Sequence, residues 1–283
     1  MLSDFSYYRP ETIEEAYMIA SKYPDTYSYI AGGTDLLSSI NNGIKNPKHI
    51  VDIKKIKSMF DFEETKDGLF IGAAVTANVF LESDFVTSYP PLAESLAHLA
   101  SYQIRNRATI VGNICNASPC ANTITSLCVL GAEVIIYTGK DQRTVLVEDF
   151  IKGVKKTDLK LFEIIVGLRI PKQFKDVRGG FLEKTRVKGP DIGSANVACL
   201  VAQSKSMVRV GLGSLSPAPI VLDFSELFGD NSIPFENKIE RVLDEVEKNI
   251  KPITDIRSTQ DYRTVIAKVY TKRLITALWK EKQ

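Results

Sequence analysis

The chain has 283 residues, 44% of them apolar and 25% charged, with a formal net charge of +2. These values are ordinary for one or two globular domains, and the small net charge gives no field that would attract nucleic acid. No apolar run approaches the roughly 18 residues of a membrane span. Four cysteines are too few for a disulfide framework in a chain of this length, and the N-terminus lacks the apolar segment of a signal peptide, so we expect a cytoplasmic protein with reduced thiols.

The first 170 residues mix predicted helices and strands. Thr12-Ile-Glu-Glu15 is a capping box that begins a helix. Further along we expect strands at 27–31, 49–53 and 69–74, and helices at 35–42, 76–83 and 91–100. The stretch 103–123 is too rich in Asn, Gly and Pro for a regular element. A helix at 122–130 then precedes strands at 132–137, 144–147 and 161–170.

The composition changes after this point. A polar segment with a glycine pair, 172–180, is the candidate linker between two domains. Strands at 180–186, 195–203 and 207–215, a Pro-rich loop at 216–219 and two helices are expected beyond it. The last of these helices, 259–280, has an apolar side made of Tyr262, Val265, Ile266, Val269, Tyr270, Ile275 and Leu278.

The first candidate site is an apolar run that ends at two glycines before a predicted helix. Its residues are Ala31, Gly32, Gly33, Thr34 and Asp35. Successive glycines allow backbone N–H groups to converge on an anion, and the helix N-terminus adds partial positive charge. The Thr34 hydroxyl is a further donor to a phosphate. A tight structural turn with Asp35 as the helix N-cap explains this motif equally well when it is taken alone.

The second candidate site is the amide-rich segment 103–123, which also suits a structural loop. It offers the uncharged hydrogen-bonding groups of Asn106, Asn113, Asn116, Ser118 and Asn122. A long polar segment is costly to order without a ligand, so a large polar cofactor is favoured. No metal site is expected, because the cysteines have no C-x-x-C spacing and the only histidines, His49 and His98, are far apart in sequence. No Ser/His/Asp or Cys/His nucleophile pattern is present either, so we assign no catalytic residue.

The two candidate segments together resemble the FAD-binding medium subunit of the molybdenum hydroxylases, the family of xanthine dehydrogenase, aerobic carbon monoxide dehydrogenase and nicotinate dehydrogenase. The resemblance rests on Ala31-Gly-Gly-Thr-Asp35 and on Thr109-Ile-Val-Gly-Asn-Ile-Cys-Asn-Ala-Ser-Pro119. Weaker pieces occur in the same order along nearly the whole chain: Phe5-Ser-Tyr-Tyr-Arg-Pro10, Val51-Asp-Ile53, Ile71-Gly-Ala73, Gln103-Ile-Arg105 and the stretch 184–191.

The resemblance implies an α+β fold. A two-lobed FAD-binding domain of the p-cresol methylhydroxylase type is expected at 1–173, with lobes of about 1–56 and 57–173. A smaller C-terminal α+β domain, an antiparallel sheet with helices, follows at 178–283.

The resemblance also assigns cofactor-binding residues. The turn at Gly32–Asp35 would bind the FAD diphosphate through main-chain amides, with Tyr29, Ile30 and Ala31 leading into it. From the second lobe Thr109, Ile110, Val111, Gly112, Asn113 and Asn122 would close over FAD, Ile165 would lie beside the flavin ring, and Lys184 is the matching basic residue near the cofactor. Val111 stands where the family usually has Gly, and Asn122 where it usually has Asp.

The implied function is electron transfer by an FAD-carrying subunit. A molybdopterin-binding large subunit would hydroxylate the substrate, and a small subunit with two-iron two-sulfur clusters would pass electrons to this FAD. NAD or another acceptor would then receive them. The alternatives are a stand-alone flavin reductase of the same fold, such as the reductase that makes UDP-N-acetylmuramate, and a non-catalytic nucleotide-binding module.

Overall fold

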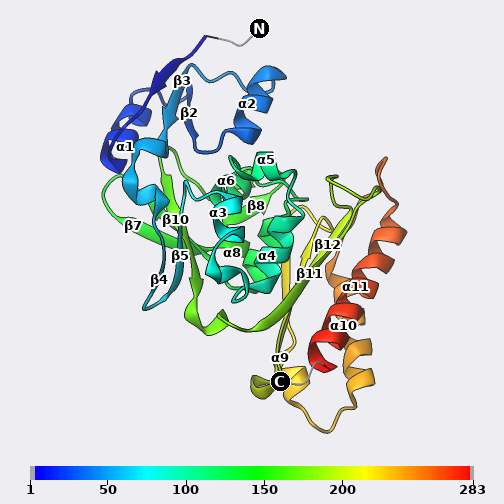
Figure 1. Ribbon diagram of the computed structural model, residues 1–283. Helices are drawn as coiled ribbons and strands as arrows, with labels where there is room; N and C mark the ends of the chain where they lie inside the picture. Colours follow the sequence, from blue (N-terminus) through cyan, green and yellow to red (C-terminus); the bar gives the residue numbers. More distant parts are fainter. Residues whose placement is uncertain (1–3, 281–283) are drawn as a thin grey trace.

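The structure, a computed structural model, describes residues 4–280 and has three parts along the chain (Figure 1). The first part is a lobe with a three-stranded parallel sheet in the order β1-β3-β2. It comprises β1 (Ser6–Tyr8), α1 (Ile13–Ser21), β2 (Tyr27–Ile30), α2 (Thr34–Asn41) and β3 (His49–Asp52). The Thr12 hydroxyl accepts the Glu15 N–H at 3.2 Å, so α1 begins where the capping box predicts.

The second part is a five-stranded antiparallel sheet, in the order β4-β5-β10-β6-β7, with helices packed on it. The strands are β4 (Phe62–Thr65), β5 (Gly68–Gly72), β6 (Glu133–Tyr137), β7 (Gln142–Leu146) and β10 (Ile164–Pro171). The helices are α3 (Ala77–Leu81), α4 (Pro90–Ala97), α5 (Tyr102–Arg105), α6 (Ile110–Cys115), α7 (Asn122–Val129) and α8 (Val147–Phe150), and a hairpin of β8 (Ile151–Gly153) and β9 (Lys156–Thr157) follows α8.

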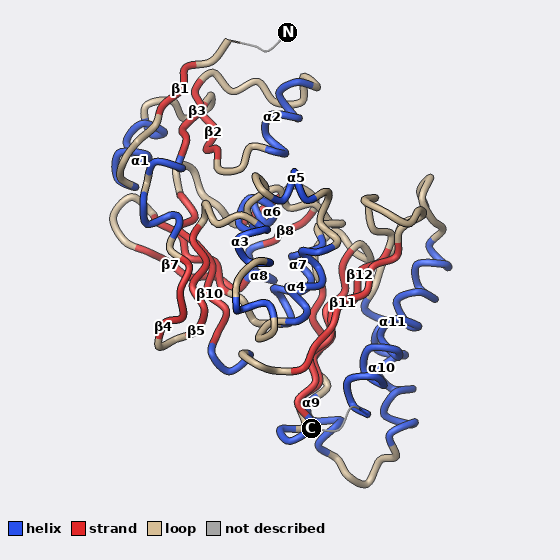
Figure 2. Tube along the Cα trace, in the orientation of Figure 1, coloured by secondary structure: helices blue, strands red, loops and turns tan. Residues whose placement is uncertain are grey.

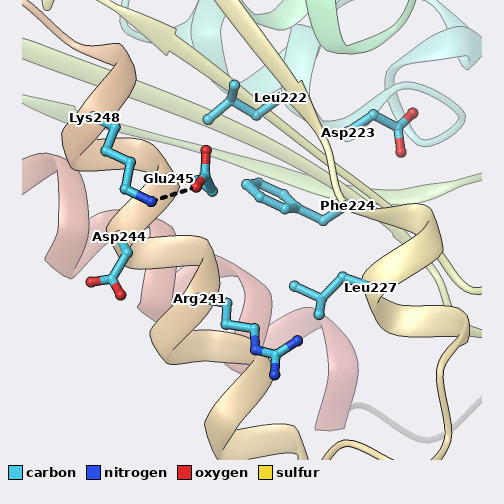
Figure 3. A pocket seen from close by; sticks show the side chains of 8 residues that line it. All are labelled: Leu222, Asp223, Phe224, Leu227, Arg241, Asp244, Glu245 and Lys248. Carbon is cyan, nitrogen blue, oxygen red and sulfur yellow. Dashed lines mark hydrogen bonds and ion pairs between the residues drawn. The ribbon is translucent and has the colours of Figure 1, made fainter.

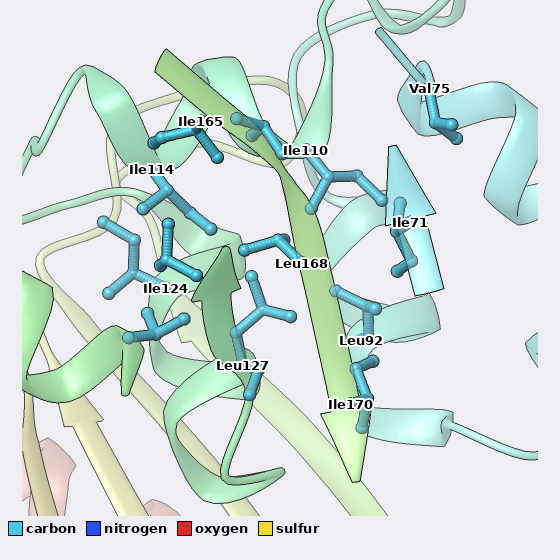
Figure 4. Packing of buried hydrophobic residues seen from close by; sticks show 14 of the residues in the cluster. Ile71, Val75, Leu92, Ile110, Ile114, Ile124, Leu127, Ile165, Leu168 and Ile170 are labelled. Atoms are coloured by element: carbon cyan, nitrogen blue, oxygen red, sulfur yellow. The ribbon is translucent and has the colours of Figure 1, made fainter. Parts of the chain in front are cut away.

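The core of the second part forms where apolar side chains of β10 meet α6 and α7. Figure 4 shows Leu168 of β10 beside Ile110 and Ile114 of α6 and Leu127 of α7, and all four are fully buried. Burying side chains of this size removes about 1.5–3 kcal/mol of unfavourable hydration each, so this contact fixes α6 and α7 on the sheet.

The prediction that 103–123 has no regular element is wrong. Two short helices, α5 and α6, form there, because Ser101 and Thr109 act as N-caps. The Thr109 hydroxyl accepts the Gly112 N–H at 2.9 Å, and Ile110 and Ile114 share one apolar face. The sequence did not reveal this cap, because Gly112 stands at the position where a capping box has Glu or Gln.

The third part is an antiparallel sheet, in the order β11-β12-β13-β14, covered by helices on its outer face. Its elements are β11 (Arg178–Lys184), β12 (Ala195–Ala202), β13 (Met207–Gly213), β14 (Ile220–Asp223), α9 (Ser225–Gly229), α10 (Phe235–Asn249) and α11 (Gln260–Lys280). Both faces of β12 are buried: Ala198 and Leu200 join the core shared with α4 and α7, while Val197 and Val201 pack toward α10 and α11. Figure 2 shows this sheet between the two groups of helices.

The candidate linker, 172–180, joins β10 to β11, which begins at Arg178, and it includes the buried side chains of Phe174 and Val177. The predicted apolar side of the last helix is correct only in part: Ile275 and Leu278 are buried, but Tyr262 and Val265 are exposed. The helix also buries Ala267, Thr271 and Leu274, which the prediction left out. No helix within residues 4–280 is long and apolar enough to cross a membrane.

Candidate functional site

A cavity of about 680 Å³ lies between the two N-terminal lobes and reaches the third part of the chain at Ile192. Most of the predicted site residues line it: Tyr29, Ile30, Ala31, Gly32, Gly33, Thr34, Asp35, Thr109, Val111, Gly112, Asn113, Asn122 and Ile165. The fold thus brings together two segments that are about 75 residues apart in sequence.

The first wall of the cavity is the turn from β2 into α2. Gly33 has φ +79°, a left-handed conformation that favours glycine, and it is the N-cap of α2 in place of Asp35. Within residues 4–280, none of the backbone N–H groups from Gly32 to Leu36 donates a hydrogen bond to another protein group. These unpaired amides at a helix N-terminus face a cavity, which is the arrangement that binds anions.

The turn lies directly against the second lobe. A Cβ atom on Gly32 would lie 2.0 Å from the carbonyl oxygen of Arg107, so any larger residue would push the two lobes apart. Glycine at this position therefore serves a close approach of two backbones.

An ion pair between Lys54 and the buried carboxylate of Asp52 supports the turn. The Lys54 ammonium donates to the Ala31 carbonyl at 2.8 Å and to Asp52 at 2.6 Å, and the Tyr7 hydroxyl also donates to Asp52. Burial by itself raises the pKa of Asp52, but the hydrogen bonds from Lys54 and Tyr7 outweigh it and lower that pKa. Asp52 is therefore ionised in the folded protein and anchors Lys54 under the turn.

The second wall is the start of α6 together with α7. The Thr109 cap places Val111, Gly112 and Asn113 along the cavity, and the Thr123 hydroxyl donates to the side-chain oxygen of Asn113. Val111 is buried within the first turn of α6, so its side chain is accommodated by the core.

Asn122, at the start of α7, is oriented by a residue of the third part of the chain. Its side-chain N–H donates to a carboxylate oxygen of Glu183 at 3.2 Å. Because the amide nitrogen is engaged in this way, the amide oxygen remains free to accept a hydrogen bond, as the carboxylate usual in the family would. Burial raises the pKa of Glu183.

Ile165 reaches the cavity at an irregularity of the central sheet. The pairing of β10 with β6 shifts register between Ile165 and Gly167, and a bulge of this kind redirects side chains. Ile165 is 5% exposed and lines the cavity.

Two further polar residues, Asn116 and Lys155, line the cavity. The Asn116 amide donates to Asp35 at 2.7 Å across the two lobes, and its oxygen accepts from the Lys155 ammonium at 2.6 Å. Asn116 belongs to the amide-rich segment, whereas Lys155 sits in a short hairpin whose position depends on tertiary contacts and leaves no local signal.

Two tyrosines of β2 also join the lobes. The Tyr29 hydroxyl donates to the carbonyl of Phe162, and the Phe162 N–H donates to the Tyr27 hydroxyl, both at 2.9 Å. Burial raises the pKa of Tyr29, so it stays protonated and keeps its donor. Next to Phe162, Arg143 donates twice to Glu163, a lining residue, and these hydrogen bonds lower the pKa of Glu163.

Two of the predicted site residues do not line the cavity. Ile110 is fully buried in the core, on the inner side of α6. Lys184 lies at the end of β11, where its carbonyl accepts both the N–H and the hydroxyl of Ser194. Their direct roles toward a cofactor stay predictions.

A second cavity, of about 440 Å³, lies in the third part of the chain between α10 and the β14–α9 segment. Figure 3 shows Lys248 and Glu245 of α10, joined by an ion pair of 2.8 Å, facing Phe224 and Leu222. No predicted site residue lies there. Among residues 4–280, no three His, Cys, Asp or Glu side chains form a group that could hold a metal ion.

Comparison with known protein families identifies the chain. The family described as the FAD binding domain in molybdopterin dehydrogenase matches residues 3–173. This chain belongs to that family. The family described as the CO dehydrogenase flavoprotein C-terminal domain matches residues 181–278. FAD is therefore the cofactor of this chain.

Two curated relatives match over almost their whole length. The putative xanthine dehydrogenase FAD-binding subunit of Escherichia coli is 28% identical over 277 residues, which cover 96% of this chain and 94% of that protein. The carbon monoxide dehydrogenase medium chain of Hydrogenophaga pseudoflava is 27% identical over 281 residues, covering 97% of each.

Solved structures agree with the fold. A carbon monoxide dehydrogenase chain from Hydrogenophaga pseudoflava superposes with a TM-score of 0.89 at 25% identity, over 99% of this chain and 98% of that one. A quinoline 2-oxidoreductase chain from Pseudomonas putida has the same TM-score at 26% identity, with 98% of each chain covered. The family resemblance and the α+β fold predicted from the sequence are thereby confirmed. The chain is an FAD-dependent oxidoreductase subunit of the molybdenum hydroxylase type, similar to xanthine dehydrogenase.

Proposed function

We propose that the chain holds FAD in the cavity between its lobes and passes electrons from an iron–sulfur subunit to NAD or another acceptor. The observation that carries this proposal is the run of unpaired amides from Gly32 to Leu36, which faces a cavity walled by both lobes. The flavin supplies the redox chemistry when it is bound, and the protein supplies binding, orientation and exclusion of water.

The residues present fit a dinucleotide with a diphosphate. The amides of Gly32–Leu36 would bind the phosphates, and the missing Cβ of Gly32 lets the second lobe close on the turn. The apolar side chains of Ile165 and Ile30 are suited to a ring system, while the oxygen of Asn122 would accept a hydrogen bond from the cofactor. We also propose that Thr34, Thr109 and Asn113, which line the same cavity, contact the cofactor.

The division into a flavin domain at 1–173, with lobes of about 1–56 and 57–173, and a C-terminal domain at 178–283 is part of this proposal. One face of β12 packs on the second lobe through Ala198 and Leu200. The C-terminal sheet therefore supports the second lobe. Its residue Glu183 accepts a hydrogen bond from Asn122 and so orients that side chain.

The proposed partners are a molybdopterin-binding large subunit and a small subunit with two-iron two-sulfur clusters. The proposal is supported by relatives whose names describe them as a medium chain or an FAD-binding subunit. A location in the cytoplasm stays a prediction.

Electron transfer with and without the partners tests this function. The purified chain should exchange electrons with dyes through its FAD, yet hydroxylate no purine, aldehyde or N-heterocycle until both partners are added. If this chain alone hydroxylated a substrate at a rate unaffected by the partners, the subunit function would be refuted. If FAD were reduced by NADH but never by the iron–sulfur subunit, the stand-alone reductase would be favoured instead.

A further inference from the structure

Lys155 is aimed at the cavity by the fold of the β8–β9 hairpin. It has φ +56°, an uncommon conformation for a residue other than glycine, and its backbone N–H donates to the Ala117 carbonyl at 2.8 Å. This contact ties the hairpin to the segment after α6. Both Lys155 and its neighbour Lys156 are exposed, but only Lys155 lines the cavity.

The side-chain amide of Asn116 connects the Lys155 ammonium to the anion-binding turn. It donates to Asn116 at 2.6 Å, and Asn116 in turn donates to Asp35 in the first turn of α2. Asp35 is itself one of the residues with an unpaired amide, so two hydrogen bonds link Lys155 to the anion-binding turn. The flexible four-carbon stem of a lysine allows its head group to move over such a short distance.

The charged residues that line the cavity favour an anionic ligand. Its charged lining residues are Asp35, Lys45, Lys155 and Glu163. The Arg143 guanidinium, at 2.6 Å, already balances Glu163. Two cations then remain against the single carboxylate of Asp35, next to amides that themselves favour negative charge.

We propose that Lys155 binds a phosphate group of the dinucleotide, with Asn116 as the residue that positions it. This inference deepens the proposed function and rests on it. A lysine serves as a point charge toward phosphate, and a charge-assisted hydrogen bond is about twice as strong as a neutral one. Lys155 supplies the full positive charge that the glycine turn lacks.

Titration of the full-length, flavin-free chain with FAD and with riboflavin, which carries no phosphate, tests the inference. Lys155→Met should weaken FAD binding at least about tenfold, or about 1.4 kcal/mol, and make it less sensitive to salt. Riboflavin binding should be unchanged. Lys156→Met is the matched control and should bind FAD as the wild type does, while Lys155→Arg should retain most of the affinity.

The outcomes separate the inference from the function on which it rests. If the wild type binds FAD and Lys155→Met binds it equally well, with the same salt dependence, the inference is overturned and the proposed function stands. Equal weakening of FAD and riboflavin would also overturn it, because Lys155 would then shape the cavity instead of binding phosphate. Loss of FAD affinity in Lys45→Met but not in Lys155→Met would assign the phosphate to Lys45. A wild type that binds no FAD would refute the proposed function itself.

Discussion

Replacing Gly32 by alanine should loosen the contact between the lobes and weaken FAD binding. The new Cβ would lie 2.0 Å from the Arg107 carbonyl oxygen and 3.1 Å from the Ala108 Cα. Even close carbon–oxygen contacts are about 3.3–3.6 Å, so the turn and the 107–108 backbone must separate by more than about 1 Å. Neither side of this contact is a flexible side chain.

Such overpacking costs about 1–3 kcal/mol. If that free energy falls on the closed, FAD-binding arrangement, the dissociation constant rises about 5- to 150-fold, since 1.4 kcal/mol is a factor of ten. Fluorescence titration of the flavin-free chain with FAD measures this change. Gly43→Ala is the control, because Gly43 has φ +70° and its Cβ would meet nothing within 4 Å. That variant should lose about 1–2 kcal/mol of stability and keep its FAD affinity. Wild-type affinity in Gly32→Ala would refute the assignment of this turn.

Further predictions concern the same walls of the cavity. Gly33→Val should abolish FAD binding while leaving the protein folded, because a β-branched residue resists φ +79° and its Cβ would lie 3.0 Å from Ile30; full retention of FAD would make the turn purely structural. Asn122→Asp should be tolerated at acidic pH and destabilise the fold as the pH rises above 4.5, the ordinary pKa of a glutamate, because its carboxylate would face Glu183. The direction of this pH dependence follows from the raised pKa of Glu183. In the folded protein Glu183 stays protonated to a higher pH than in the unfolded chain, so the stability falls as the pH rises through that pKa. Urea unfolding at pH 5 and pH 8 measures this difference, and an equal loss at both values would contradict it.

The glycine turn and the amide-rich segment could be found from the sequence because their chemistry is local. A glycine pair between an apolar strand and a helix already limits the backbone to a few conformations, and the structure places Gly33 in the left-handed region. The pairing of this turn with Thr109 came from the family resemblance, since no local pattern links two segments so far apart. Their contact, between Gly32 and Arg107, depends on how two lobes pack.

The parts that sequence reasoning missed depend on tertiary structure. The cap of α6 uses Thr109 and Gly112, a pair without the usual acidic or amide residue at the third position. Lys155 faces the cavity only because its hairpin is tied to Ala117. Tyr262 and Val265 are exposed because α11 packs on β12 through other residues, such as Ala267 and Leu274.

The flavin content of the purified chain is the sharpest test of FAD binding between the lobes. We expect one FAD per chain, held without a covalent bond, because the phosphate site is built from backbone amides. Acid precipitation should release all of the yellow colour into the supernatant. Colour that remains in the pellet would contradict non-covalent binding. A chain that takes up no FAD from an excess of the cofactor would refute the proposed function.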